Sequence, residues 1–189
     1  MSNPITRRQY RVLKFLVDLF DELDIDYFID DGLAAIIYGS KRKLYDIDIC
    51  IGKKSISKIK KEFNDLARTK YSYKTYSNCK SYIVTLKING VPIDAYIDKN
   101  FYICHKKHKH TECKVLKNPF KDTQVVMFKG IKLRVIHPED LIIQKAFMNR
   151  KTDWFDVKSI MRKTNINKNR LLLLSKKFGV SQEKIMVKK

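Results

Sequence analysis

The spacing of apolar residues predicts helices at both ends of the chain. Residues 5–23 place apolar side chains three or four positions apart, which is typical of one face of a helix. That face is predicted to contain Val12, Phe15, Leu16, Leu19, Phe20 and Leu23. Residues 55–68 predict a second amphipathic helix, with Ser55 as a candidate N-cap. Further helices are predicted over 137–149, 153–162 and 168–177, followed by a short last helix.

Alternating apolar and polar positions predict strands in the first two thirds of the chain. The segments "DYFID" and "YDIDICI" indicate two strands on either side of a short helix, "GLAAIIYG". Residues 81–98 predict a hairpin around Asn89-Gly90, a dipeptide typical of type I′ turns. Residues 101–136 predict further short strands, with Gly130 in a turn. The expected fold class is α+β, with a mixed sheet flanked by helices over 1–136 and a helical region over 137–189 packed on it.

Composition and charge limit the environment in which the protein works and the chemistry of its partners. The chain has 189 residues, enough for one domain with a real core, and 44% are hydrophobic, which argues against disorder. Forty Lys and Arg against 20 Asp and Glu give a net charge of +20. This excess favours an anionic partner, although a lysine-rich solvated surface would give the same count. Apolar runs are far shorter than the roughly 20 residues of a membrane span. A cytoplasmic protein with no membrane partner is expected.

Three aspartates are the candidate chemical groups. Asp46 and Asp48 are two positions apart on a predicted strand, so their carboxylates project from the same face. Such a pair repels unless a cation or a hydrogen-bond network lies between the two groups. Mg²⁺ combines a few carboxylates with water and phosphate oxygens, so it fits this arrangement. Asp94, in another alternating strand, is the candidate third carboxylate, and an ordinary solvent-facing strand is the alternative interpretation.

The stretch over 30–51, "DDGLAAIIYGSKRKLYDIDICI", resembles the signature of the nucleotidyltransferase superfamily. The similarity is to the branch of minimal nucleotidyltransferases and AbiEii-type proteins. That pattern has two adjacent glycines, a short helix, a glycine, an arginine and a D-x-D strand. The matching positions here are Gly32, Ala34, Gly39, Arg42, Asp46 and Asp48, with Asp94 as the third family aspartate. The segment "VIHPEDLIIQKAFMNRKTDWFDV" is also similar, so the resemblance covers about 26–98 and 134–160.

The resemblance implies a DNA polymerase β-like fold and a two-metal transfer of a nucleoside monophosphate. Asp46, Asp48 and Asp94 would hold Mg²⁺, or Mn²⁺ in its place. Asp94 could also act as the base on the acceptor hydroxyl. Two metals stabilise both the attacking and the leaving oxygen of such a displacement.

The same resemblance implies where a nucleoside triphosphate such as ATP would bind. Gly32, and in second place Ser40, would approach the phosphates, and Arg42 and Lys145 would neutralise their charge. Arg42 could instead be a solvated turn residue, and Lys145 a surface lysine of a helix. Asp31 replaces the first family glycine, and its charge would repel phosphate unless it points away or joins the metal.

Two classes of function remain open from the sequence. The first is an enzyme whose acceptor is RNA, a protein or a small molecule, with the basic charge favouring RNA such as tRNA ends. The second is a catalytically degenerate module of the same fold that binds nucleic acid or a protein partner, as Asp31 would suggest.

A second cluster lies over 104–113, "CHKKHKHTEC". Cys104, His108, His110 and Cys113 could bind zinc, but the spacing is not that of a standard finger. The cluster could equally be a basic nucleic-acid contact or a solvated loop. Tyrosines and lysines interleave over 68–82, which is a weak signal for base stacking.

Overall fold

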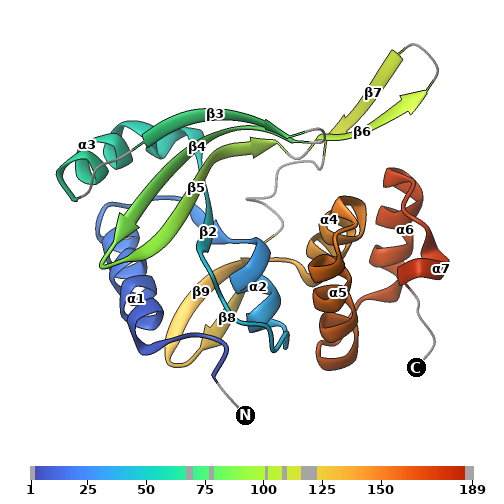
Figure 1. The fold of residues 1–189 in the computed structure, drawn as a ribbon, viewed down its shortest axis with the longest axis horizontal. Coiled ribbons are helices and arrows are strands. Elements are labelled where there is room, and N and C mark those ends of the chain that lie inside the picture. The colour runs from blue at the N-terminus through green and yellow to red at the C-terminus, as the bar shows by residue number, and fades with distance from the viewer. Residues whose placement is uncertain are drawn as a thin grey trace.

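The computed structural model describes residues 3–66, 70–76, 79–100, 102–107, 110–115 and 123–185. Within these ranges the largest sheet is mixed and seven-stranded, with the order β3-β4-β5-β2-β1-β9-β8 (Figure 1). Its strands are β1 (Tyr27–Ile29), β2 (Ile47–Ile51), β3 (Lys70–Tyr76), β4 (Cys79–Ile88), β5 (Val91–Asn100), β8 (Thr123–Phe128) and β9 (Ile131–Ile136). β2 is parallel to β5 and β1 is parallel to β9, while the other neighbouring pairs are antiparallel.

The remaining elements are one hairpin and the helices. The hairpin consists of β6 (Tyr102–Lys107) and β7 (His110–Val115), and it projects away from the large sheet (Figure 1). The helices are α1 (Arg7–Glu22), α2 (Asp31–Ile37), the 3₁₀ turn η1 (Lys53–Ser55), α3 (Ile56–Leu66), α4 (Pro138–Met148), α5 (Lys151–Lys163), α6 (Lys168–Phe178) and α7 (Gln182–Ile185). The α+β class with a mixed sheet is confirmed. No helix in the described part of the chain is long and apolar enough to cross a membrane.

Helix α1 begins with a capping box and buries a slightly different face from the one predicted. Thr6 and Gln9 each bond the other's backbone N–H, which satisfies two donors at the helix start. The prediction that Phe15 belongs to the buried face is wrong, because its side chain is 41% exposed. Successive residues of a helix are about 100° apart, and the face that meets the core is centred elsewhere. Its buried apolar members are Val12, Leu13, Leu16, Val17 and Phe20.

The turn between β4 and β5 fixes the strand that carries one candidate aspartate. Asn89 and Gly90 have φ values of 46° and 78°, as a type I′ turn requires, so the predicted hairpin is confirmed. β5 then runs back beside β4 and pairs on its other edge with β2. The hairpin therefore brings the middle of β5 next to the D-x-D segment.

Helices α4 to α7 gather at one end of the molecule, and α2 lies between them and the central strands (Figure 1). Pro138 occupies the first turn of α4, as its sequence predicts, and α2 contacts both α4 and α5. The last strand ends at Ile136, directly before these helices. The division into parts at 136 and 137 stays a prediction, but it coincides with this change from strand to helix.

Candidate active site

The paired strands β2 and β5 bring two of the three predicted aspartates together. Asp48 is the register partner of Asp94, and register partners on adjacent strands project to the same face of a sheet. Asp48 is only 5% exposed. Asp94 Oδ1 accepts a hydrogen bond of 2.7 Å from Thr85 Oγ1 on β4, and this bond orients its carboxylate. Asp46 immediately precedes β2 and is partly buried.

Asp46 lies within the electrostatic influence of the neighbouring carboxylates. Burial, followed by the negative charges of Asp31 and Asp94, raises the pKa of Asp46 above its ordinary value. Its ionised form is therefore disfavoured unless a positive charge compensates it. A divalent cation would provide that compensation.

The donor chemistry of this group fits Mg²⁺ or Mn²⁺, because its side-chain donors are carboxylate oxygens. Within the described ranges, however, no group of three or more His, Cys, Asp or Glu side chains forms a ready metal site. Mg²⁺ is usually held by one or two carboxylates, waters and substrate phosphates. Asp46, Asp48 and Asp94 fit a site of that kind, which the phosphates of a nucleotide would complete.

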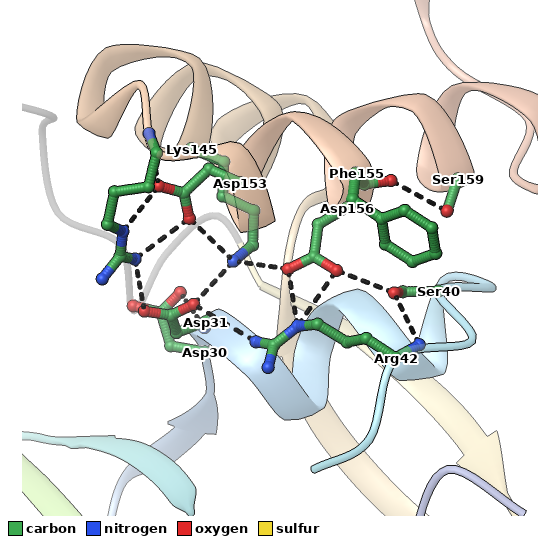
Figure 2. Close-up of polar contacts among 10 residues, drawn as sticks. Asp30, Asp31, Ser40, Arg42, Lys145, Asp153, Phe155, Asp156 and Ser159 are labelled. Carbon is green, nitrogen blue, oxygen red and sulfur yellow. Dashed lines mark hydrogen bonds and ion pairs between the residues drawn. The ribbon is translucent and has the colours of Figure 1, made fainter. Parts of the chain in front are cut away.

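Beside these carboxylates, a buried lysine of α4 organises the contact with α2 and α5. Lys145 Nζ lies 2.6 Å from Asp31 Oδ1, 2.9 Å from Asp156 Oδ2 and 3.6 Å from Asp153 Oδ1, and its side chain is 3% exposed (Figure 2). Burial alone would lower the pKa of Lys145. The charges and hydrogen bonds of Asp31 and Asp156 outweigh burial and raise this pKa instead. Lys145 therefore carries its charge inside the protein.

Arg42 lies over the start of α2 and is held there by Asp156. Its Nε lies 2.9 and 3.1 Å from the two carboxylate oxygens of Asp156. Its Nη2 lies 3.9 Å from Asp31 Oδ1. A Cβ added to Gly32 would lie 2.4 Å from Arg42 Nη2. Glycine at position 32 thus leaves the space that the guanidinium group occupies.

Ser40 is brought to the same group of residues but not to its exposed side. The residue is 2% exposed, and its Oγ donates a 2.7 Å hydrogen bond to Asp156 Oδ1 (Figure 2). This contact orients Asp156. A role for Ser40 in phosphate binding stays a prediction, and this placement gives it no support.

The sequence interpretation did not assign the residues at the start of α5. Arg150 donates to both carboxylate oxygens of Asp153, at 2.7 and 3.0 Å. The hydrogen bond to Asp153, with the charges of Asp153, Asp31 and Asp48, raises the pKa of Arg150 despite its partial burial. Asp153 and Asp156 are three positions apart, so they share one helix face, and this spacing was the available signal.

Asp30 is a second residue that the sequence interpretation left without a role. It is fully buried, caps α2 and accepts a 2.7 Å hydrogen bond from the backbone N–H of Asp31. Its backbone N–H donates to the carbonyl of Asp48 on β2. Asp30 therefore ties the start of α2 to the strand of the candidate catalytic pair.

The predicted Cys and His cluster is only partly described. Cys104 and Cys113 are register partners on β6 and β7, while His108 lies outside the described residues. The zinc interpretation stays a prediction. The interleaved tyrosines and lysines over 68–82 also stay a prediction, since 68, 69, 77 and 78 lie outside the described residues.

The paired aspartates of the sheet and the cations beside it agree with the resemblance to nucleotidyltransferases, and sequence comparison supports this class. The profile of a family described as "Nucleotidyl transferase of unknown function (DUF2204)" matches residues 11–186. The chain belongs to this family. No curated protein matches it in sequence.

Three solved structures of similar fold are distant from this chain in sequence. TM1012 from Thermotoga maritima, assigned as a nucleotidyltransferase, has a TM-score of 0.60 at 16% identity over 85% of this chain and 97% of its own. The lincosamide antibiotic adenylyltransferase LnuA, bound to lincomycin, has a TM-score of 0.59 at 20% identity over 86% and 100%. ANT(2″)-Ia in complex with adenylyl-2″-tobramycin has a TM-score of 0.61 at 13% identity over 91% and 97%. At these identities the likeness establishes the fold.

Proposed function

We propose that this protein transfers a nucleoside monophosphate from a nucleoside triphosphate, such as ATP, to a hydroxyl group of an RNA. The observation that carries the proposal is the register of Asp48 with Asp94, with Asp46 directly before the same strand. In a chain of a nucleotidyltransferase family, such carboxylates would hold divalent metal ions. The roles of individual residues below belong to the proposal.

The reaction is an in-line displacement at the α-phosphorus. The acceptor oxygen forms a bond to this phosphorus, the bond to the bridging oxygen of the β-phosphate breaks, and pyrophosphate leaves. Asp94 takes the hydroxyl proton, and the hydrogen bond from Thr85 holds its carboxylate in one orientation. Asp46, Asp48 and Asp94 would hold Mg²⁺ or Mn²⁺, which when bound supplies positive charge for the attacking and leaving oxygens.

The cations of α4 and of the turn after α2 would bind the phosphates. Arg42 is 20% exposed and its guanidinium position is fixed by Asp156, so it needs little reorganisation to meet an anion. Lys145 lies deeper and contributes charge from behind Asp31. Gly32 allows Arg42 to lie against the backbone of α2.

The choice of RNA as acceptor rests on the exposed surface next to these groups. Tyr45, directly before Asp46, is 72% exposed, and Phe155, directly before Asp156, is 51% exposed. The turn after α2 and helix α5 also carry exposed basic residues: Lys41, Lys43, Lys151, Lys158, Arg162 and Lys163. Exposed aromatic rings stack on bases and lysines contact phosphates, so this surface fits a single-stranded RNA end.

A small-molecule hydroxyl is the second candidate acceptor. LnuA is an antibiotic adenylyltransferase, and the ANT(2″)-Ia complex holds an adenylylated tobramycin. The shared fold permits the same reaction here, but the net charge of +20 favours a polyanionic acceptor.

The test is to incubate the protein with Mg²⁺ and each of the four nucleoside triphosphates, labelled at either the α- or the γ-phosphate. Total RNA, tRNA and a panel of aminoglycosides and lincosamides serve as acceptors. We expect α-label, and no γ-label, to become attached to RNA. If α-label is transferred only to small molecules, the acceptor is a small molecule and not RNA. Absence of transfer and of nucleotide binding by the folded protein would favour the degenerate binding module.

A further inference from the structure

Equal numbers of cations and carboxylates form a network beside the candidate catalytic aspartates. Within the described residues, its members are the cations Arg42, Lys145 and Arg150 and the carboxylates Asp31, Asp153 and Asp156. Charge is therefore balanced inside the network, so an anion that binds its cations competes with one of its carboxylates.

The three carboxylates differ strongly in exposure. The side chains of Asp153 and Asp156 are each 1% exposed, so removing either from its partners would leave a buried charge without compensation. The side chain of Asp31 is 34% exposed, and that of Arg150 is 54% exposed. Asp31 is thus the member of this trio that an incoming anion can replace from the solvent side.

The contacts of Asp31 show that its carboxylate fits these cations loosely. Among these three cations, Lys145 Nζ approaches it to 2.6 Å. The guanidinium groups of Arg42 and Arg150 remain 3.9 and 3.8 Å away, which is longer than a hydrogen bond. A phosphoryl group is larger, carries more charge and presents three acceptor oxygens, so it could contact all three cations at once.

The backbone also holds Asp31 in an unusual conformation. Its φ is 43°, in the left-handed region that few residues other than glycine adopt. Asparagine tolerates this region as well as aspartate does. An Asp31→Asn substitution therefore removes the charge and leaves the backbone undisturbed.

We propose that Arg42, Lys145 and Arg150 form a phosphate-binding subsite, and that the Asp31 carboxylate competes for it and is displaced by a phosphate of the nucleotide. This inference rests on the proposed function for the identity of the phosphate donor. It adds Arg150 to the binding residues and makes Asp31 an internal competitor that weakens binding. The subsite adjoins the carboxylates of β2, because Asp31 acts electrostatically on Asp46 and Arg150 is influenced by Asp48.

The test measures the binding of sodium tripolyphosphate and of Mg²⁺–ATP by isothermal titration calorimetry. Tripolyphosphate has no nucleobase, so it probes the subsite even if the preferred nucleotide is unknown. Wild type is compared with Asp31→Asn and with the matched control Asp26→Asn, which alters an exposed aspartate paired with Arg134. If Asp31 occupies the cations at least about nine-tenths of the time, its neutralisation raises affinity about tenfold or more. Arg150→Gln in the Asp31→Asn background should remove most of this gain. Melting curves establish that every variant is folded.

The outcomes separate this inference from the proposed function. Tighter binding of tripolyphosphate by Asp31→Asn, with Asp26→Asn unchanged, supports the subsite. Equal or weaker binding of tripolyphosphate by Asp31→Asn overturns the subsite, and so does the failure of both proteins to bind tripolyphosphate. If Asp31→Asn loses affinity only for Mg²⁺–ATP, Asp31 is a metal ligand and not a competitor. If wild type transfers α-label but Asp31→Asn does not bind tripolyphosphate more tightly, only the subsite is refuted. If Asp31→Asn binds tripolyphosphate more tightly but neither protein transfers α-label, only the proposed function is refuted.

Discussion

Replacing the buried carboxylate of Asp156 should destabilise the protein strongly. Asp156 is fully buried and accepts hydrogen bonds from Ser40 and from Nε of Arg42, and it lies 2.9 Å from Lys145 Nζ. Asp156→Asn removes the charge and directs an N–H₂ donor at groups that are themselves donors. Breaking a buried ion pair from one side costs about 3–5 kcal/mol.

This cost can be read as a shift in melting temperature. A chain of this size loses about 2–4 °C per kcal/mol, so Asp156→Asn should melt roughly 6–20 °C below wild type. The assay is thermal unfolding followed by far-ultraviolet circular dichroism, with urea unfolding to check the free energy. The free energy of unfolding should fall by the same few kcal/mol at low and at high salt, because a buried contact is weakly screened.

The matched control is Asp18→Asn. Asp18 pairs with Lys14 at 2.7 Å, but both side chains are more than half exposed. Exposed pairs contribute about 0.2–1 kcal/mol and are screened by salt. If Asp156→Asn melts within about 4 °C of wild type, as Asp18→Asn should, the idea that Asp156 anchors the site is refuted.

Three further changes test other parts of the account. Gly32→Ala should push aside the Arg42 guanidinium, which is the end of a flexible side chain, so stability should change little while ATP binding measured by calorimetry becomes weaker; an unchanged affinity would show that Arg42 does not contact the nucleotide. Leu133→Ala, at a fully buried position of β9, should lower the free energy of urea unfolding by about 2–5 kcal/mol. Asp46→Asn should raise the melting temperature at pH 8, because the raised pKa of Asp46 means that its ionised form destabilises the fold above that pKa. This gain should shrink as the pH falls toward the ordinary aspartate pKa, and a gain independent of pH would contradict the electrostatic cause.

The parts of the fold that could be predicted depend on local signals. Asn89-Gly90 specifies its turn through the φ values that it tolerates, and strand alternation then places Asp94 on a strand able to reach the D-x-D segment. Pro138 marks the start of α4 for an equally local reason. Phe15 was misplaced because two overlapping stripes of α1 have helical spacing, and spacing alone does not decide which of them faces the core.

The cation network could not be derived in the same way. Ser40 and Asp156 are 116 positions apart in the chain, and their contact exists only because α2 packs against α4 and α5. The aspartates of α5 could have faced solvent equally well on spacing alone. The resemblance over 134–160 drew attention to the segment, but the pairing of Lys145 with Asp31 needed the three-dimensional arrangement.

The most direct test of the central claim is the rate of α-label transfer by Asp48→Asn and Asp94→Asn relative to wild type at saturating Mg²⁺ and nucleotide. Asp26→Asn serves as the exposed control. If these paired carboxylates carry the chemistry, each of the two substitutions should lower the rate by at least about 10²–10³-fold while the protein stays folded. A transfer rate within a few-fold of wild type in either folded variant would contradict the proposal.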